Sequence, residues 1–222
     1  MGKKIEDFVP KQLLIEISKH ISNIYEEKRT ESWESSRSDE DALCGHFFGA
    51  MIKNETEFSD NLSWKINYKK TRGRGKQNPE TAIGADGIYT FELKNKNGDI
   101  IFQKAFLFQA KMDKSFNENT TLSQVKKMNS TTQNGSVIIV FCEKEFKVIK
   151  TSDYLQSRSK FPHVSFEKYV NDEFLKCLHG EQNMNYNINE EKLTILDDNN
   201  IVKKEVQSSL KSELKITVSR KK

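Results

Sequence analysis

The sequence predicts an α/β protein whose core runs helix, three-strand antiparallel meander, helix, strand, with helical N- and C-terminal extensions. Three observations predict this fold. Apolar residues recur at helical spacing on both sides of segments in which apolar and polar residues alternate. An Asn-Gly turn joins two of the alternating segments, which is typical of a hairpin. A continuous apolar run follows, as expected for a strand buried on both faces.

Length and composition favour one domain. The chain has 222 residues, of which 35% are hydrophobic and 31% charged, enough for a single sizeable core. We divide it into an N-terminal helical extension (1–37), a core (38–150) and a C-terminal extension (151–222). The formal charge is only +4, so the basic excess alone does not indicate a polyanionic partner.

The chain lacks the signals of a secreted or membrane protein. Its beginning has no signal-peptide run, and no apolar stretch is long enough to span a bilayer. Cys44, Cys142 and Cys177 lie far apart, without zinc-ligand spacing, and are expected to be reduced thiols. We therefore expect a soluble, cytoplasmic protein that makes no membrane contact.

Two helices are expected first. Residues 10 to 27 begin with a proline suited to a first turn and carry Leu13, Leu14, Ile17, Ile21 and Ile24 at helical spacing. The polar run "KRTESWESSRSD" breaks this periodicity. Ser38, with Asp41 three residues later, resembles a capping box and predicts that the second helix is "DEDALCGHFFGAM".

Strands follow these helices. The segments "NLSWKINYKK" and "GADGIYTFEL" alternate, and a turn containing Asn97 and Gly98 leads into "IIFQKAFLFQAK". The second and third segments should therefore pair antiparallel. Next come a short helix, "TLSQVKKMN", and a buried strand, "VIIVFC".

The pattern is weaker after residue 150. "FEKYVNDEFLKCLHG" has one broad apolar face and stops at Gly180, which predicts a helix. In the tail, "IVKKEVQSSLKSEL" fits a helix, whereas "ELKITVSR" alternates like a strand. Both interpretations of the tail remain open.

Three side chains near the predicted hairpin are candidates for a site. Asp86 lies between glycines at the start of the second strand, and Gln109 and Lys111 project from the same side of the third. Singly, Asp86 fits a turn residue, and the other two fit a solvated strand end. Pairing of the two strands would bring all three to one end of the sheet.

These residue types suit phosphodiester hydrolysis. The reaction needs a metal to polarise the phosphoryl group, oxygen ligands to hold that metal, and a cation near the developing charge. The Asp86 carboxylate, the Gln109 amide oxygen and the Ala110 carbonyl would bind Mg²⁺, with Mn²⁺ able to substitute. Lys111 would orient the water or neutralise charge.

The order and spacing of these motifs resemble the PD-(D/E)xK, or restriction-endonuclease-like, nuclease superfamily. "SDEDALCGHFFGAM", "IGADGIY" and "FLFQAK" together look like the nuclease domain of bacterial antiphage effectors, such as those of CBASS and the Lamassu nuclease subunit. The resemblance covers residues 38 to 142. It implies that Asp86 is the metal-binding acid and Lys111 the motif lysine, whereas Gln109 departs from the usual Asp or Glu.

The resemblance also implies an acidic site residue on the first core helix, which would complete the catalytic and metal-binding set. We choose Glu40, because it shares a helix face with Leu43 and Phe47, and keep Asp39 and Asp41 as alternatives. An acid in a first helical turn is also favoured by the helix dipole alone. No histidine has triad or zinc spacing, and His46 is the only one singled out for a test.

A basic loop precedes the candidate site. "YKKTRGRGKQNPE" contains Lys69, Lys70, Arg72, Arg74 and Lys76, which could contact DNA phosphates without reading sequence. The alternative is a solvated loop.

The sequence therefore predicts a Mg²⁺-dependent endodeoxyribonuclease of low sequence specificity that acts on double-stranded DNA. The resemblance implies the effector of an antiphage complex, controlled by assembly, as in a homo-oligomer, or by a sensor subunit such as an SMC-like ATPase. Residues 10 to 27 and 200 to 222 are the expected docking surfaces. The alternatives are a sequence-specific restriction or repair nuclease and a non-catalytic nucleic-acid-binding subunit.

Overall fold

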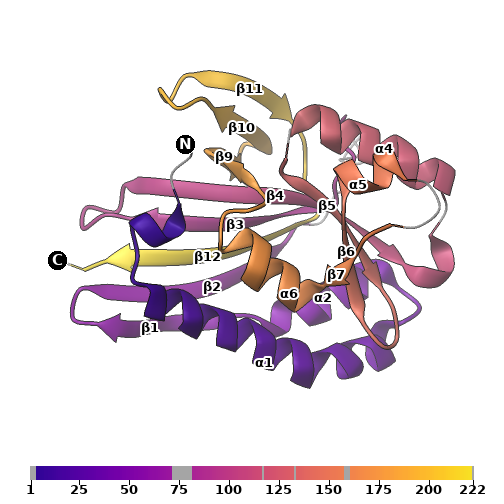
Figure 1. The fold of residues 1–222 in the computed structure, drawn as a ribbon, viewed down its shortest axis with the longest axis horizontal. Helices are drawn as coiled ribbons and strands as arrows, with labels where there is room; N and C mark the ends of the chain where they lie inside the picture. The colour runs from indigo at the N-terminus through magenta and orange to yellow at the C-terminus, as the bar shows by residue number, and fades with distance from the viewer. Residues whose placement is uncertain (1–3, 72–81, 117, 133, 158–160, 222) are drawn as a thin grey trace.

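The protein is built on a mixed β-sheet (Figure 1). The computed structural model describes residues 4–71, 82–116, 118–132, 134–157 and 161–221. The strands are β1 (Lys53–Ser59), β2 (Leu62–Lys70), β3 (Gly87–Lys94), β4 (Ile100–Met112), β5 (Ser136–Phe141), β6 (Phe146–Lys150), β7 (Val164–Ser165), β8 (Glu181–Gln182), β9 (Met184–Asn187), β10 (Lys192–Leu196), β11 (Val202–Gln207) and β12 (Ser212–Arg220). In the described residues the main sheet has the order β1-β2-β12-β3-β4-β5-β6-β7, with β8 beside β4, and a second sheet has the order β11-β10-β9.

Helices cover both faces of the main sheet. They are α1 (Lys11–Ser36), α2 (Glu40–Ala50), α4 (Glu118–Thr131), α5 (Thr151–Gln156) and α6 (Phe166–Lys168), together with the short helical turns η1 (Ile5–Asp7), η2 (Asp113–Ser115) and the π-helical η3 (Tyr169–Phe174). No helix in the described part of the chain is long and apolar enough to cross a membrane.

The predicted hairpin and the helix and strand that follow it are confirmed. Strands β3 and β4 form the expected antiparallel hairpin, in which Gly87 is paired with Phe108, and Gly98 adopts a φ of +90° in the turn. Helix α4 then crosses over, and β5 runs parallel to β4 with Gln109 opposite Ile138. The protein is thus a mixed α/β fold, as predicted.

The predicted contiguous meander is wrong, because β12 lies between β2 and β3. It runs antiparallel to β2 and parallel to β3. Leu214, Ile216 and Val218 point from β12 into the core with no more than 1% of their surface exposed. Of the two interpretations of the C-terminal segment, the strand indicated by the alternation at these positions is therefore correct. Burial of this strand stabilises the sheet.

The predicted helical C-terminal extension is also wrong. Residues 181 to 221 form strands β8 to β12 in place of helices. Val202 and Val206, which suggested a helix, are four residues apart, and that spacing fits a strand face as well as a helix face. The helix expected up to Gly180 shortens to α6 and η3, and Gly180 follows with a φ of +111°.

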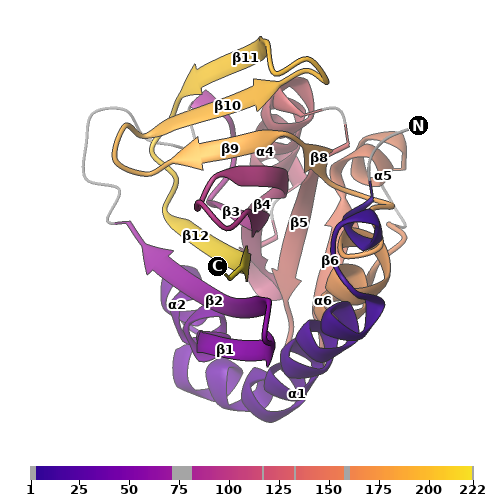
Figure 2. The ribbon, with the colours of Figure 1, turned by 90° about the vertical axis from the view of Figure 1, so that its left-hand side faces the viewer.

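Helices α1 and α2 lie together under one face of the sheet (Figures 1 and 2). Leu13, Ile17 and Ile21 are fully buried, so the apolar face proposed for docking is covered by the protein's own core. Helix α1 also continues beyond the predicted end to Ser36, since Trp33 remains buried against the core. The helix is consequently an integral part of the domain.

The start of α2 differs from the predicted cap by one residue. Asp39 is the N-cap, and its carboxylate accepts a hydrogen bond of 3.0 Å from the Ala42 amide. Ser38 and Asp41 therefore do not form the predicted capping box. The outcome is that Glu40 and Asp41 both lie in the first helical turn.

The opposite face of the sheet carries a second core. Val125 and Met128 of α4 pack there with residues of the small sheet, including Tyr186 and Leu193. Figure 2 shows the β9-β10-β11 sheet lying above the ends of β3 and β4. The sheet is thus the middle of three layers.

Candidate functional site

One edge of the main sheet collects the candidate residues. Strands β2 and β4 end there, while β3 and β12 begin there, because the first two run antiparallel to the second two. Asp86 lies one residue before β3, and Lys111 is the penultimate residue of β4. The start of α2 approaches the same edge from the helical layer.

The backbone of Asp86 is held between two strands. Its amide donates to the Phe108 carbonyl over 2.8 Å. Its own carbonyl accepts from the amides of Lys211, at 2.8 Å, and Ser212, at 3.2 Å. Asp86 is therefore fixed by β4 on one side and by the start of β12 on the other.

The turn before Asp86 requires glycine at residue 84. Gly84 adopts a φ of +74°, and a Cβ there would overlap the backbone carbonyl of Gln124 in α4. An L side chain would be strained by the backbone conformation and would also collide with the helix. This close approach sets the path of the chain into Asp86.

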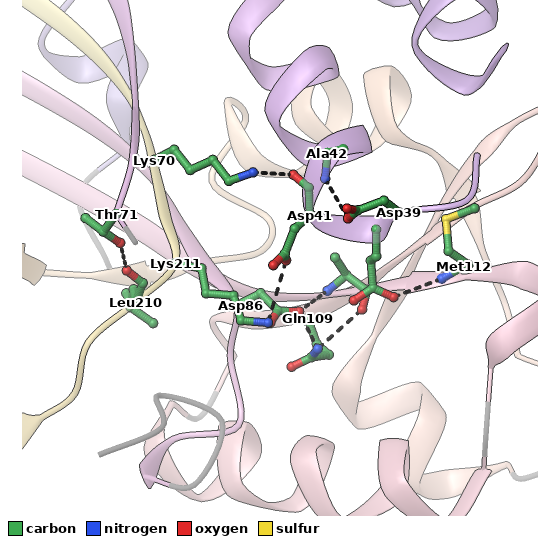
Figure 3. Close-up of polar contacts among 12 residues, drawn as sticks. Asp39, Asp41, Ala42, Lys70, Thr71, Asp86, Gln109, Met112, Leu210 and Lys211 are labelled. Atoms are coloured by element: carbon green, nitrogen blue, oxygen red, sulfur yellow. Dashed lines mark hydrogen bonds and ion pairs between the residues drawn. The ribbon is translucent and has the colours of Figure 1, made fainter. Parts of the chain in front are cut away.

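The Asp86 side chain is almost fully buried and is surrounded by donors (Figure 3). Its Oδ2 atom accepts from the Gln109 Nε2 atom and, at 2.9 Å, from the Ala110 amide. Its Oδ1 atom forms an ion pair of 2.9 Å with Lys211 Nζ. Burial raises the pKa of Asp86, and the charge of Lys211 opposes this rise most strongly.

Gln109 belongs to the face of β4 expected from strand alternation. Phe108 and Ala110 point into the α1 and α2 side of the core, whereas Gln109 points to the other side and is fully buried. Its Nε2 atom lies within 3.3 Å of the Ala110 carbonyl as well as beside Asp86. Its Oε1 atom is buried and has no hydrogen-bond partner among the residues that the structure describes.

Glu40 approaches the end of β4 from the first turn of α2. Its Oε2 atom accepts a hydrogen bond of 3.2 Å from the Met112 amide. Burial raises the pKa of Glu40 to about 7, while Lys111 lowers it and Asp86 raises it further. The three charged groups are thus close enough to influence one another, and Glu40 can exchange a proton near neutral pH.

Neighbouring acids of α2 take other roles. Asp39 caps the helix, and the exposed Asp41 carboxylate lies 3.6 Å from Lys211 Nζ. The Asp41 carbonyl accepts a hydrogen bond of 2.8 Å from Lys70. Within this acidic run, Glu40 is therefore the residue whose carboxylate contacts the end of β4.

The basic loop is described only at its start. Lys69 and Lys70 are exposed at the end of β2, on the same edge as Asp86. The Thr71 amide donates to the Lys211 carbonyl over 2.8 Å, which ties the loop's first residue to the site. The other three predicted phosphate contacts, Arg72, Arg74 and Lys76, lie outside the described residues.

Histidine and cysteine side chains add no group to this set, although the buried Cys44 of α2 lies within electrostatic range of Asp86 and Glu40, and burial raises its pKa well above the usual value. His46 Nδ1 is 2.8 Å from the Ser36 hydroxyl at the end of α1. All three cysteines are free thiols, and two of them, Cys44 and Cys142, are buried. In the described chain, no cluster of three or more His, Cys, Asp or Glu side chains could hold a metal.

Sequence reasoning missed Lys211. Its position beside Asp86 depends on the insertion of β12 next to β3, and the local pattern around it fits helix and strand alike. The alternation "ELKITVSR" was the only signal, because it predicts a strand that begins two residues after Lys211.

The edge thus unites Glu40, Asp86, Gln109 and Lys111 with one unexpected cation from the C-terminal segment. Two acids, two lysines and one amide meet where four strand ends converge. These residues carry the inference of function. Comparisons of the chain with family models, with curated proteins and with solved structures found no match.

Proposed function

We propose that the protein is a metal-dependent DNA endonuclease that hydrolyses phosphodiester bonds with low sequence specificity. The observation that carries this proposal is the contact of Asp86 with Gln109 and Ala110 at the edge where β3 begins and β4 ends. Glu40 and Lys111 lie within electrostatic range of that contact. Buried charges and amides gathered in this way are typical of functional sites.

The donor set suits a hard divalent cation. The Asp86 carboxylate, the Gln109 Oε1 atom, the Ala110 carbonyl and the Glu40 carboxylate are all oxygen ligands of the kind that Mg²⁺ prefers. The Gln109 Nε2 atom faces Asp86 and the Ala110 carbonyl, so the amide would have to turn over to present its oxygen to a cation shared with them. Its buried Oε1 atom has no hydrogen-bond partner among the described residues that would oppose this rotation. Bound Mg²⁺ or Mn²⁺ would polarise the phosphoryl group and lower the pKa of a bound water.

The chain's own charged groups supply the remaining chemistry. Lys111 would neutralise the charge that develops on the phosphate oxygens. Glu40, whose pKa is about 7, would accept or return the proton of the attacking water at its carboxylate. The new bond joins the water oxygen to phosphorus as the bond to the leaving oxygen breaks.

The arrangement of elements supports a restriction-endonuclease-like core. Helix α2, strands β2, β3 and β4, helix α4 and strand β5 occur along the chain in the order expected of that superfamily, with the additional strand β1 between α2 and β2. The insertion of β12 between β2 and β3 is the departure. This insertion leaves the β3-β4 hairpin intact. The proposed active-site residues lie on α2, immediately before β3 and on β4.

Double-stranded DNA would lie across the edge where the basic loop begins. Lys69 and Lys70 would contact phosphates, and Arg72, Arg74 and Lys76 would extend that contact. Such contacts carry no base information, which fits cleavage of low specificity. We further propose that the chain is a cytoplasmic antiphage effector, controlled by its own assembly or by a sensor partner such as an SMC-like ATPase.

Cleavage of supercoiled plasmid tests the function. Wild type should nick or linearise the plasmid with Mg²⁺ or Mn²⁺ and not with EDTA, with proteins encoded beside it added where needed. Asp86→Ala and Lys111→Ala should lower the rate by at least about a hundredfold. Lys96→Ala, which removes an exposed lysine at the opposite end of the β3-β4 hairpin, is the charge-matched control and should cut normally. Cutting that survives Asp86→Ala would contradict the proposal.

A second function is favoured by one observation. The Asp86 carboxylate is already satisfied by Gln109, Ala110 and Lys211, as expected for a site that serves assembly without catalysis. The protein would then be a nucleic-acid-binding subunit. Gel-shift binding of DNA in EDTA, with no cleavage under any metal or partner condition, would support this second function.

A further inference from the structure

Lys211 reaches the candidate site from the segment that precedes β12. Its Nζ atom lies 2.9 Å from Asp86 Oδ1 and 3.6 Å from Asp41 Oδ1. The Lys211 side chain is 25% exposed, whereas that of Asp86 is 4% exposed. The ammonium group thus pairs with both the buried Asp86 carboxylate and the exposed Asp41 carboxylate (Figure 3).

The backbone around Lys211 is anchored on both sides. The Lys211 amide donates to the Asp86 carbonyl, and its carbonyl accepts from the Thr71 amide, each over 2.8 Å. The preceding Leu210 amide donates to the Tyr186 hydroxyl at 3.0 Å. Lys211 is therefore placed at Asp86 by the fold, and only its flexible side chain is left to move.

The same carboxylate is the first ligand expected for a divalent cation. With Lys211 in place, the net formal charge of the site is zero when both acids are ionised. The four charged groups are Glu40, Asp86, Lys111 and Lys211. The Gln109 amide presents its nitrogen to Asp86 Oδ2, so a donor also occupies the position between Asp86 and the Ala110 carbonyl. A second cation at Asp86 would meet the repulsion of Lys211 at short range.

We propose that Lys211 is a built-in counter-ion that competes with a divalent cation for Asp86 and so weakens metal binding by the isolated chain. This inference rests on the proposed metal site and adds its regulation. A phosphate group of the DNA backbone is the ligand that would draw the ammonium group away, because the Lys211 side chain is 25% exposed and its positive charge would attract the phosphate. Phosphate and divalent cation would then bind cooperatively.

Calorimetric titration with Mn²⁺ tests the competition without any cleavage readout. Lys211→Met should bind Mn²⁺ at least about tenfold more tightly than wild type. Lys211→Gln keeps a hydrogen-bond donor for Asp86 and removes only the charge, so it should bind more tightly too, even if Lys211→Met fails to fold. Lys150→Met is the matched control, because Lys150 pairs at 2.5 Å with a partly buried acid, Glu173, elsewhere, and its Mn²⁺ affinity should equal that of wild type.

The outcomes separate this inference from the nuclease proposal. Equal Mn²⁺ affinity of wild type and Lys211→Gln, or no Mn²⁺ binding by either, would overturn the counter-ion role. Tighter binding by the variant without cleavage under any condition would uphold the counter-ion role and remove the nuclease function. Metal-dependent cleavage together with an unchanged Mn²⁺ affinity would uphold the nuclease function and overturn the counter-ion role.

Discussion

The residue that most distinguishes this site is Gln109, because an amide stands where a second carboxylate would be expected from the family resemblance. Gln109 donates to Asp86 from a fully buried position. A carboxylate there would face Asp86 without a donor between them, and two buried like charges in contact destabilise a fold. The Gln109 amide therefore keeps the Asp86 carboxylate hydrogen-bonded when no metal is bound.

Gln109→Glu is expected to make the folded state depend on a divalent cation. In EDTA at pH 8, the free energy of unfolding should fall by about 1–3 kcal/mol, since a buried acceptor pair loses its donor. Millimolar Mg²⁺ should restore most of that loss and stabilise the wild type less. Urea unfolding followed by circular dichroism, with EDTA and with Mg²⁺, measures both effects.

Gln103→Glu provides the matched control on the same strand. The Gln103 Nε2 atom lies 3.4 Å from Glu92 Oε1 and 3.1 Å from Asn185 Oδ1, so this change also sets two buried carboxylates against each other. We expect a similar loss in EDTA and no recovery with Mg²⁺, because the proposed ligands lie at the other end of β4. Recovery of both variants, or of neither, would contradict a metal site at Gln109.

The sequence could predict the residues whose positions depend on local pairing. Asp86, Gln109 and Lys111 are separated by one hairpin, and the turn at Gly98 fixes the register between β3 and β4. Strand alternation then decides which side chains share a face. Lys211 could not be predicted in this way, because its place depends on a strand pairing far along the chain.

At the scale of elements, β12 has two functions in the fold. It fills the place between β2 and β3, and the residue before it carries the cation that meets Asp86. Four residues after Lys211, Lys215 pairs at 2.8 Å with Glu92 of β3 in the same manner. The strand thus places two lysines beside two acids of the β3 segment, which fixes its register by charge as well as by packing.

The C-terminal segment also shows which feature of the fold cannot be predicted from the local sequence pattern. The alternation of Leu214, Ile216 and Val218 predicts a strand but cannot say which neighbours it joins. Partner choice depends on the apolar faces of β2 and β3, which are brought together only in the folded sheet. A helix or strand can be inferred from a short segment, whereas insertion into the middle of a sheet cannot.

Ile216→Ala is expected to destabilise the protein strongly, in contrast to a change on a free surface. Ile216 is fully buried in the centre of β12, so the free energy of unfolding should fall by about 2–5 kcal/mol. Ile201→Ala, just before β11, removes a side chain that is 63% exposed and should cost less than about 0.5 kcal/mol. Thermal melting of the two variants measures the difference.

Equal melting temperatures for these variants would show that β12 is a dispensable extension. The structure places β12 among the central strands, so the docking surface once expected over residues 200 to 222 is reduced to its exposed part. Val202 of β11 is 54% exposed and belongs to that part.

At the scale of the whole molecule, acid stability should be limited by a buried histidine remote from the candidate site. His179 is 3% exposed, and its Nδ1 atom lies 2.5 Å from the Tyr169 hydroxyl. Burial lowers the pKa of His179 to about 3, and the charges of Lys150 and Lys104 lower it as well. The folded protein therefore keeps this ring neutral at pH values where the unfolded chain protonates it.

The sign of the pH dependence follows from proton binding. Above the unfolded pKa of about 6.5, neither state binds the proton and the full stability is present. As the pH falls from there toward 3, only the unfolded state binds it, so the free energy of unfolding decreases, by about 3–5 kcal/mol in total.

His179→Gln should be less stable at pH 7.5, because it disturbs the contact with Tyr169, but its stability should fall less on acidification. Urea unfolding at a series of pH values gives the two slopes, and their difference cancels the carboxylates that titrate in both proteins. His163→Gln, which changes a half-exposed ring 4.0 Å from Glu145, should keep the wild-type slope. If His179→Gln also kept that slope, the acid sensitivity would have to arise from other groups, and the buried His179 ring would not be the group that limits folding at low pH.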